Sequence, residues 1–175
     1  TDEATTLNAF QNSQARIDYL NACVAELHTN SNTVATLWAT YKDDYITATQ
    51  SGISGSQNQM INNMVALLEE IIISKLNSGI NNTDSEEFEA HRSDYSLSLI
   101  ASNMDAIHRC YTGDFAETPY RIGFKKYLVD LGYDGLATDI DEKFNAVTAK
   151  INSMNSSLNS GLTSTPEDLT ELVNL

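Results

Sequence analysis

The 175-residue chain is long enough for one domain with a substantial core, or for one domain and a short appendage. Its 10 basic and 24 acidic residues leave a formal net charge of −14, which repels nucleic-acid phosphates and anionic membrane surfaces. The same charge would attract cations, metal ions included, or would simply keep the protein in solution. Only two prolines and eight glycines interrupt the sequence, which favours long helices over a β fold with many turns.

Two amphipathic helices are predicted near the start of the chain. Apolar residues three or four apart indicate the first over about 6–28, where His28 at the end would suit the helix dipole. Asn30-Ser31-Asn32 then predicts a turn, with Ser31 as the N-cap of the next helix. That second helix extends to about residue 46 and carries its apolar side chains on one side.

A third helix is predicted over 57–76, after a break rich in glycine and serine at 50–56. Gly79 supplies its C-terminal end. The next segment, 81–93, is polar, acidic and aperiodic, and it predicts the longest loop of the chain. Long loops in compact domains are functional more often than short ones.

Four side chains of this loop have the chemistry of metal ligands. Carboxylates with an imidazole suit a divalent or ferric ion, and the loop offers Glu86, Glu87, Glu89 and His91. Glu89 and His91 are two residues apart, so only an extended loop would bring them together. A solvated acidic loop is the simpler interpretation. The sequence contains no HExxH, GxSxG, P-loop or dinucleotide-binding glycine pattern, so it holds no complete catalytic motif of these kinds.

The rest of the chain predicts four more helices. They cover about 95–111, 121–131, 136–158 and 167–175. Gly113 ends the first, a loop over 114–119 follows it, and Gly132 to Gly135 breaks the chain after the second. The third has apolar steps of three and four residues, and Thr165-Pro166 is typical of the start of the last. Amphipathic helices joined by short loops predict an all-α antiparallel bundle.

The sequence alone does not decide the interaction partners of two pairs of residues. Glu69 and Glu70 lie on an otherwise apolar face, where Lys75 could pair with one of them. Cys23 and Cys110 have no CxxC spacing, which argues against a zinc or redox motif. Both cysteines lie in stretches with apolar patterning, so buried free thiols and a disulfide between two helices are both compatible with the sequence.

The segment from Glu89 to Gly113 contains an ordered set of short motifs. It contains, in order, Glu89-Ala-His-Arg-Ser93, Ser96-Leu97, Asn103-Met104 and Tyr111-Thr-Gly113. This order resembles the C-terminal signature of the imelysin-like family. Further stretches agree in order, namely Arg16, Tyr19-Leu20, Leu27 and Trp38, then Met64, Glu69-Glu70 and Lys75-Leu76, then Leu131 and Gly135-Leu136. One position departs, because the family often has aspartate where this chain has Leu99.

The resemblance implies a fold and a location. Imelysin-like proteins are all-α, built of two helical-bundle halves, bacterial, and exported to the periplasm or tethered as lipoproteins. Their GxHxxE motif, which is thought to bind metal, lies in the first half and is absent from this sequence. We therefore expect residues 1–175 to be a single helical-bundle domain that resembles the C-terminal half of a larger protein. The start at Thr1 in place of methionine agrees with this expectation, and no run in the chain is apolar enough to span a membrane.

The resemblance also implies two alternative functions. The first is a non-catalytic module of bacterial iron uptake that binds metal, haem or a partner. The second is half of a metallopeptidase whose metal motif lies in the missing N-terminal half. A third interpretation, independent of the family, is a stand-alone helical interaction domain. Under the first two, this chain alone catalyses nothing, and the metal would be iron or another divalent or trivalent ion. Its partners would be the N-terminal half and iron-uptake components.

Seven positions match the family pattern, and the resemblance implies that they line a cleft between the two halves. They are Glu70, Lys75, Glu89, Ser93, Ser96, Asn103 and Tyr111, and His91 joins them as the imidazole of the acidic loop. Simpler structural roles are equally open for these positions. Ser93 and Ser96 could cap the helix over 95–111, and Asn103 could tie one helix to another.

Overall fold

The computed structural model describes residues 2–115 and 122–175, and all regular structure in these residues is helical. The all-α prediction is therefore confirmed. The chain divides into two compact units, Thr1–Gln59 and Met60–Leu175. Across the described ranges, no helix has both the length and the apolar character needed to cross a bilayer.

The first unit contains a short helix, α1 (Glu3–Gln11), and a long helix, α2 (Gln14–Thr47). Asp2 caps α1, since its Oδ1 accepts a hydrogen bond from the Thr5 amide at 2.7 Å. This bond stabilises the ionised carboxyl and lowers the pKa of Asp2. The helix predicted over 6–28 is thus divided, because the chain leaves helical geometry at Asn12 and Ser13.

The turn predicted at Asn30-Ser31-Asn32 is wrong, because α2 continues through it. Ser31 Oγ donates to the Leu27 carbonyl at 2.8 Å, and Thr29 Oγ1 bonds in the same way to a carbonyl four residues back. Polar side chains that are satisfied on the helix's own carbonyls do not require a turn, and no glycine or proline breaks the helix here. His28 consequently lies inside α2 and does not end a helix.

The first unit has no buried helical layer of its own, because no side chain of α1 or α2 is buried. An aromatic cluster lies near the end of α2, where the ring centroids of Trp38, Tyr41 and Tyr45 lie 5.6 to 6.1 Å apart. Tyr45 Oη also donates a hydrogen bond to the Ser56 carbonyl at 3.1 Å. This bond holds the segment after α2 against the helix end.

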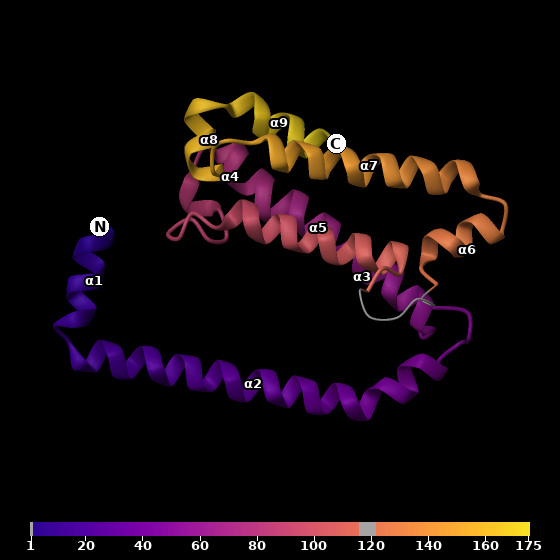
Figure 1. Ribbon diagram of the computed structural model, residues 1–175, viewed down its shortest axis with the longest axis horizontal. Helices are drawn as coiled ribbons and strands as arrows, with labels where there is room; N and C mark the ends of the chain where they lie inside the picture. Colours follow the sequence, from indigo (N-terminus) through magenta and orange to yellow (C-terminus); the bar gives the residue numbers. More distant parts are fainter. Residues whose placement is uncertain (1, 116–121) are drawn as a thin grey trace. The chain divides into compact units, whose positions relative to one another are not determined.

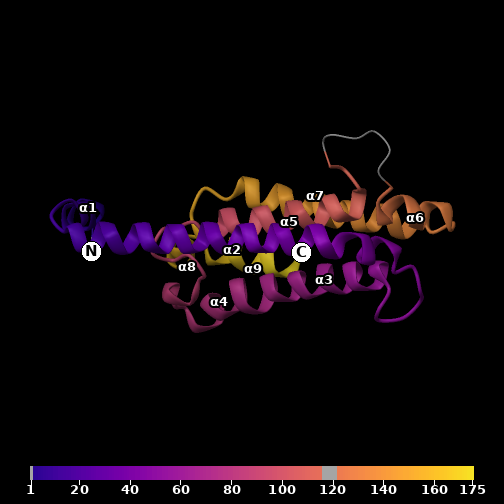
Figure 2. The ribbon, with the colours of Figure 1, turned by 90° about the horizontal axis from the view of Figure 1, so that it is seen from below.

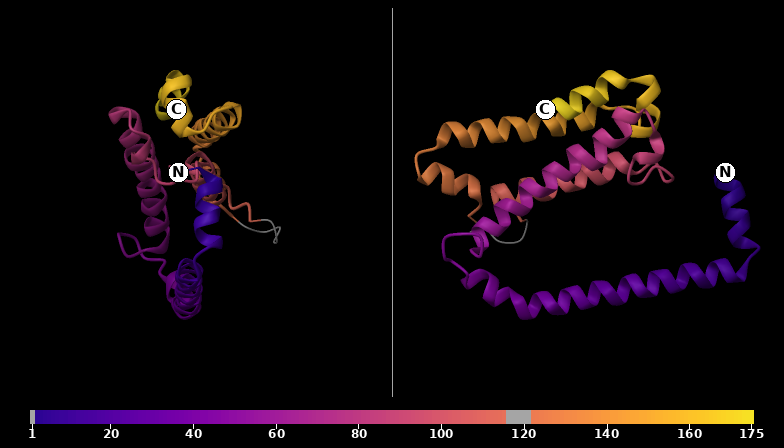
Figure 3. Two further views of the ribbon diagram at one scale, coloured as in Figure 1. Left: turned by 90° about the vertical axis from the view of Figure 1, so that its left-hand side faces the viewer. Right: turned by 180° about the vertical axis from the view of Figure 1, so that it is seen from behind.

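The second unit is an antiparallel arrangement of helices (Figure 1). A continuous helical run leads to one end of the unit, and α5 returns along it (Figure 2). After the short α6, α7 runs back again, and α8 and α9 complete the chain (Figure 3). The elements are α3 (Ser56–Glu70), whose first four residues belong to the first unit, the π-helix η1 (Ile71–Asn77), α4 (Ser78–Asn82), the 3-10 turn η2 (Ser85–Glu87), α5 (Ser96–Thr112), α6 (Phe124–Asp130), α7 (Asp134–Ser153), α8 (Leu158–Ser164) and α9 (Pro166–Asn174).

Apolar residues from most of these elements form the core of the second unit. They are Ile71, Leu76, Phe88, Ile100, Met104, Ile107, Ile151, Leu158, Leu169 and Leu172. The helix predicted over 95–111 turns one apolar face inward, since Ile100, Met104, Ile107 and Tyr111 are all buried. Full burial of one such side chain contributes about 1.5–3 kcal/mol, so this face accounts for much of the packing energy.

The sequence predicts that Gly79 ends the third helix. This prediction is wrong, because the helical run continues to Asn82. The chain then leaves the helix at Thr83, whose φ of 51° is left-handed. Gly79 is needed for close packing: a Cβ at this position would overlap the ring of Phe88. The glycine therefore lets a buried aromatic ring approach the helix backbone.

The helix predicted over 136–158 ends earlier, at Ser153. Met154 is extended, and Ser157 then caps α8 by accepting a hydrogen bond from the Ser160 amide at 3.3 Å. Leu158, the last apolar position of the helix predicted over 136–158, is buried at the start of α8 and therefore belongs to the next helix. The last helix begins at Pro166, as predicted.

The prediction around Gly113 is confirmed, because this residue ends α5 with a left-handed φ of 76°. The short helix predicted over 121–131 begins at Phe124 among the described residues. Arg121 and most of the loop predicted over 114–119 lie outside the described residues.

Candidate functional site

The segment between α4 and α5 folds back on η1. We call residues 75–96, from the end of η1 through α4 and this segment to the first residue of α5, the loop corner. Its main ionic contact joins Lys75 Nζ to Glu89 Oε2 at 2.6 Å. The side chain of Lys75 is 14% exposed and that of Glu89 is 48% exposed, so the pair lies at the edge of the packed unit. The predicted pairing of Lys75 with Glu69 or Glu70 is therefore wrong, and Glu70 accepts a hydrogen bond from Ser74 Oγ within its own helical run.

A second contact ties the acidic part of the loop corner to the same helical run. Ser78 Oγ donates to Glu87 Oε2 at 2.8 Å. Phe88, the next residue, is 1% exposed and packs against Gly79. The charged residues on either side of Phe88 thus hold its ring in the core, because each bonds to a different point of the helix that the ring covers.

Ser96 connects the loop corner to the start of α5. Its buried Oγ accepts a hydrogen bond from the Ala90 amide at 3.2 Å, while Ser93 Oγ donates to the Ala90 carbonyl at 3.2 Å. The capping role predicted for both serines is wrong, because α5 begins at Ser96 with Tyr95 in the cap position and no side-chain cap bond. Both hydroxyls are used to close the turn before the helix.

His91 is half-buried at the end of the loop corner. Its Nδ1 lies 3.3 Å from the Phe88 carbonyl, and its own carbonyl accepts a hydrogen bond from Asn159 Nδ2 at 2.7 Å. Asn159 belongs to α8, so this bond ties the last part of the chain to the loop corner. The imidazole is therefore positioned by a local backbone contact.

The loop corner does not form the metal site that its composition permits. Across residues 2–115 and 122–175, no three histidine, cysteine or acidic side chains converge as metal ligands. The acidic side chains have separate partners: Glu87 bonds to Ser78, Glu89 pairs with Lys75, and Asp84 Oδ1 accepts from the Glu86 amide at 2.9 Å. These local bonds direct the carboxylates to different points.

Tyr111 lies near the far end of α5, about 22 Å along the helix axis from Ser96. Its Oη donates to the Ala137 carbonyl at 3.1 Å, and its ring stacks on Phe144 with centroids 5.9 Å apart. Burial, with a smaller contribution from the charge of Asp141, raises the pKa of the Tyr111 hydroxyl. The residue therefore joins α5 to α7 and lies away from the loop corner.

Asn103 and the two cysteines complete the sequence-derived candidates. The Nδ2 atom of Asn103 is buried and has no hydrogen-bond partner among the described residues, so no bond from this amide ties helix to helix. Cys23 and Cys110 are free thiols. Cys23 is exposed, which contradicts the buried position suggested by its surroundings in the sequence, and Cys110 is half-buried.

A pocket that the sequence does not reveal lies within the second unit. It has a volume of about 380 Å³ and is bounded by side chains of α3, η1, α5, α7, α9 and the C-terminal residue. The apolar lining residues are Leu68, Ile71, Ile72, Leu76, Ile100, Met104, Ile140, Phe144, Val147, Leu172, Val173 and Leu175. Each of these fits a core pattern when taken alone, so periodicity could not show that they surround an open space.

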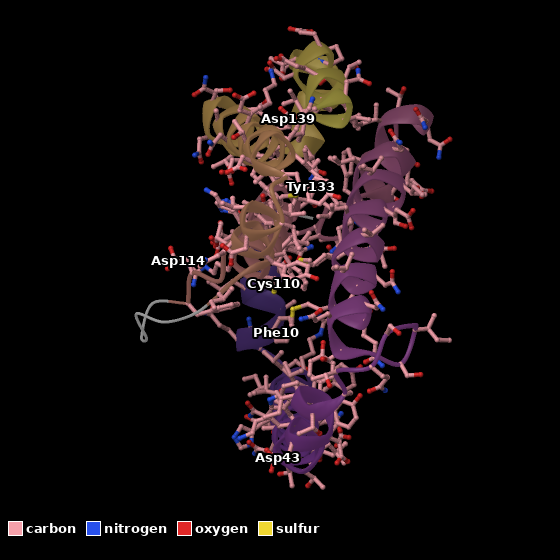
Figure 4. All side chains as sticks on the ribbon, turned by 90° about the vertical axis from the view of Figure 1, so that its right-hand side faces the viewer. Phe10, Asp43, Cys110, Asp114, Tyr133 and Asp139 are labelled. Atoms are coloured by element: carbon pink, nitrogen blue, oxygen red, sulfur yellow. The ribbon has the colours of Figure 1, made fainter. Side chains whose placement is uncertain are left out.

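Two polar residues of α7, Asp139 and Lys143, complete the pocket wall. Both are exposed, and neither forms a salt bridge among the described residues. Asp139 lies in the first half of α7, and its side chain is labelled in Figure 4. The pocket and the loop corner share no hydrogen-bonded or charged residue.

Comparisons with known proteins give one match. The model of the imelysin family, also described as peptidase M75, matches residues 1–174. No curated protein and no solved structure matches the chain. The family match extends over both units and includes the loop corner and every pocket-lining residue except Leu175.

Proposed function

Because the chain belongs to the imelysin family, we propose that it is a binding module of a bacterial, extracytoplasmic iron-acquisition system and performs no catalysis alone. The observation that carries this proposal is the family match over residues 1–174. The geometry of the loop corner supports it, because the acidic loop is engaged in structural contacts.

The loop corner is the part of the chain that we propose as one wall of a cleft. Glu89 and Ser93 are exposed there and His91 is half-buried, so their outer atoms are open to a ligand or to another part of the protein. In contrast, Ser96 and Tyr111 are buried and bond within the second unit. We therefore assign the binding surface to the exposed residues and a supporting role to the buried ones.

The described residues do not by themselves fit a complete iron site, since they gather no group of three ligands. Carboxylate and imidazole are suitable ligands for iron, and Glu89 and His91 are such a pair two residues apart in the sequence of the loop corner. We propose that this chain is the C-terminal portion of a two-half protein and that most metal ligands come from the half with the GxHxxE motif.

The test uses the full-length protein in its own host. We expect deletion of the gene to lower iron uptake under iron limitation, and the purified full-length protein to retain iron or haem by elemental analysis and absorbance. A Glu89→Gln variant should lower uptake while the protein remains folded by circular dichroism. Asp130→Asn is the matched control, because it also removes one carboxylate from a lysine pair, on α6.

Two results would overturn the proposal. If the full-length protein bound neither metal nor haem and deletion left iron uptake unchanged, the iron-acquisition role would be wrong. If the protein with added metal cleaved peptides, and if that activity required the GxHxxE residues, the metallopeptidase alternative would replace it.

A further inference from the structure

We propose that the apolar pocket of the second unit binds a single-chain amphiphile with a zwitterionic headgroup, such as a lysophospholipid with an ethanolamine head. The acyl chain would occupy the apolar space, and the headgroup would lie at Asp139 and Lys143. The pocket shares Leu76 with the loop corner but none of the charged or hydrogen-bonded residues there, so this site can exist whether or not the proposed iron-acquisition role is correct.

The size and lining of the pocket favour one acyl chain. Its volume of about 380 Å³ is at the lower end of the range found for ligand sites. A water molecule occupies roughly 30 Å³ of liquid, and a methylene group is similar in size, so the pocket holds about a dozen methylene groups. Apart from Asp139 and Lys143, the residues that line the wall are apolar.

The π-helix η1 forms part of the pocket wall. π-Helical segments are rare and occur frequently at functional sites, and this one supplies Ile71, Ile72 and Leu76 to the lining. Ile71 and Leu76 are almost fully buried, whereas Ile72 is 41% exposed. The η1 wall therefore extends from the core to the solvent, as a site for a chain with a solvated headgroup requires.

The charges at the pocket select the headgroup. Asp139 and Lys143 are four residues apart on α7, so they lie on one face of the helix about 5–6 Å apart at Cβ. Neither has a salt-bridge partner among the described residues, whereas Lys150, on the same helix, pairs with Asp168 and Glu171. A fatty acid would satisfy Lys143 and be repelled by Asp139. A phosphate with a nearby ammonium group complements both residues.

The experiment is calorimetric titration of the full chain with lauroyl lysophosphatidylethanolamine below its critical micelle concentration. We expect saturable binding of one molecule per chain. Lauric acid and dodecylamine should each bind more weakly than the zwitterion, and the headgroup without its acyl chain should not bind measurably. These three compounds separate the contributions of chain, anion and cation.

Variants locate the site. Lys143→Gln and Asp139→Asn should each weaken binding about two- to fivefold, the range of an exposed ion pair. Ile72→Trp should fill the pocket and weaken binding about tenfold or more. Its matched control is Ile73→Trp, because Ile73 is the next residue of η1, is 63% exposed and does not line the pocket. Glu142→Gln, an exposed residue of α7 outside the lining, is the control for charge.

Several outcomes would overturn the proposal. Absence of saturable binding below the micelle concentration, or equal losses in the Ile72 and Ile73 variants, would show that the pocket is not the site. Equal affinity for lauric acid and the zwitterion would refute the assignment of the headgroup. If the wild type were a dimer and Ile72→Trp a monomer, a second copy would fill the pocket in place of a lipid.

Discussion

The two units use the same kind of amphipathic helix with different results. In the second unit, the apolar positions of α5 are covered, and Ile100 and Met104 are 1% and 8% exposed. Within the first unit, no other element covers the corresponding apolar positions of α2, and Leu27 and Leu37 are 67% and 63% exposed. Periodicity therefore specifies a helix in both units, but only the second unit supplies a layer that buries the apolar face.

The largest expected effect tests this difference with one substitution in each unit. Leu169→Ala should lower the free energy of unfolding by about 2–5 kcal/mol, because Leu169 is fully buried and its removal leaves a cavity. Leu37→Ala on α2 should change it by less than about 0.5 kcal/mol, as is usual for exposed positions. Denaturant unfolding followed by circular dichroism measures both. Equal losses would show that α2 is packed as tightly as α9.

The second prediction concerns the contact that anchors the loop corner. Gly79→Ala should lower the free energy of unfolding by about 1–3 kcal/mol, because the added methyl group overlaps the Phe88 ring. Gly135→Ala on α7 is the control, since a Cβ there meets no atom within 4 Å and alanine favours the helix by up to about 1 kcal/mol. Thermal unfolding measures both variants, and we expect a lower melting temperature for Gly79→Ala and a higher one for Gly135→Ala. A stabilising Gly79→Ala would mean that Phe88 does not pack on this helix.

The third prediction concerns Tyr111 and has a pH dependence. Tyr111→Phe should cost about 1 kcal/mol at neutral pH through the lost hydrogen bond to Ala137. Because the folded pKa lies above the ordinary value of 10.0, the unfolded chain loses its proton first, and stability falls as pH rises above 10.0. Urea unfolding at neutral and alkaline pH should therefore show a smaller alkaline loss in the variant. An identical loss in both proteins would contradict the burial of this hydroxyl.

The smallest expected effect concerns the contact between α7 and α9. The hydrogen bond from Lys150 lowers the pKa of Asp168. The ionised carboxyl therefore stabilises the folded state at pH values above 3.8, the pKa in the unfolded chain, and this stabilisation is lost as the pH falls through the folded pKa. Asp168→Asn should reduce stability slightly at neutral pH and flatten the acid limb of a melting-temperature profile. Glu167→Asn, at the exposed neighbour, is the control. An unchanged acid limb in Asp168→Asn would show that this pair does not form.

Local sequence signals located most helices but not all of their ends. Gly113 and Pro166 were reliable because their backbone restrictions act locally. The error at Ser31 is also local, because its hydroxyl bonds to a carbonyl of its own helix and needs no turn. The errors at Gly79 and Leu158 have a different cause, since Gly79 packs against the Phe88 ring and Leu158 against the core of the second unit.

The candidate site shows the same limit. Lys75, Glu89, His91, Ser93 and Ser96 lie in one corner of the fold, whereas Tyr111 lies away from it and bonds to α7. Their partners could not be predicted, because the pairing of Lys75 with Glu89 depends on how residues 83–95 return to η1. The pocket was missed for a related reason: an apolar side chain on a helix has the same periodicity whether a neighbour covers it or an open space adjoins it.

The sequence by itself determined the all-α class, the acidic surface and the membership of the imelysin family, because composition, helical period and motif order are properties of the chain alone. The tertiary structure decided which apolar faces are buried, which carboxylate meets Lys75, and where the second unit leaves an apolar pocket beside Asp139 and Lys143. These features arise from contacts between residues far apart in the sequence, and such contacts are set by how helices pack.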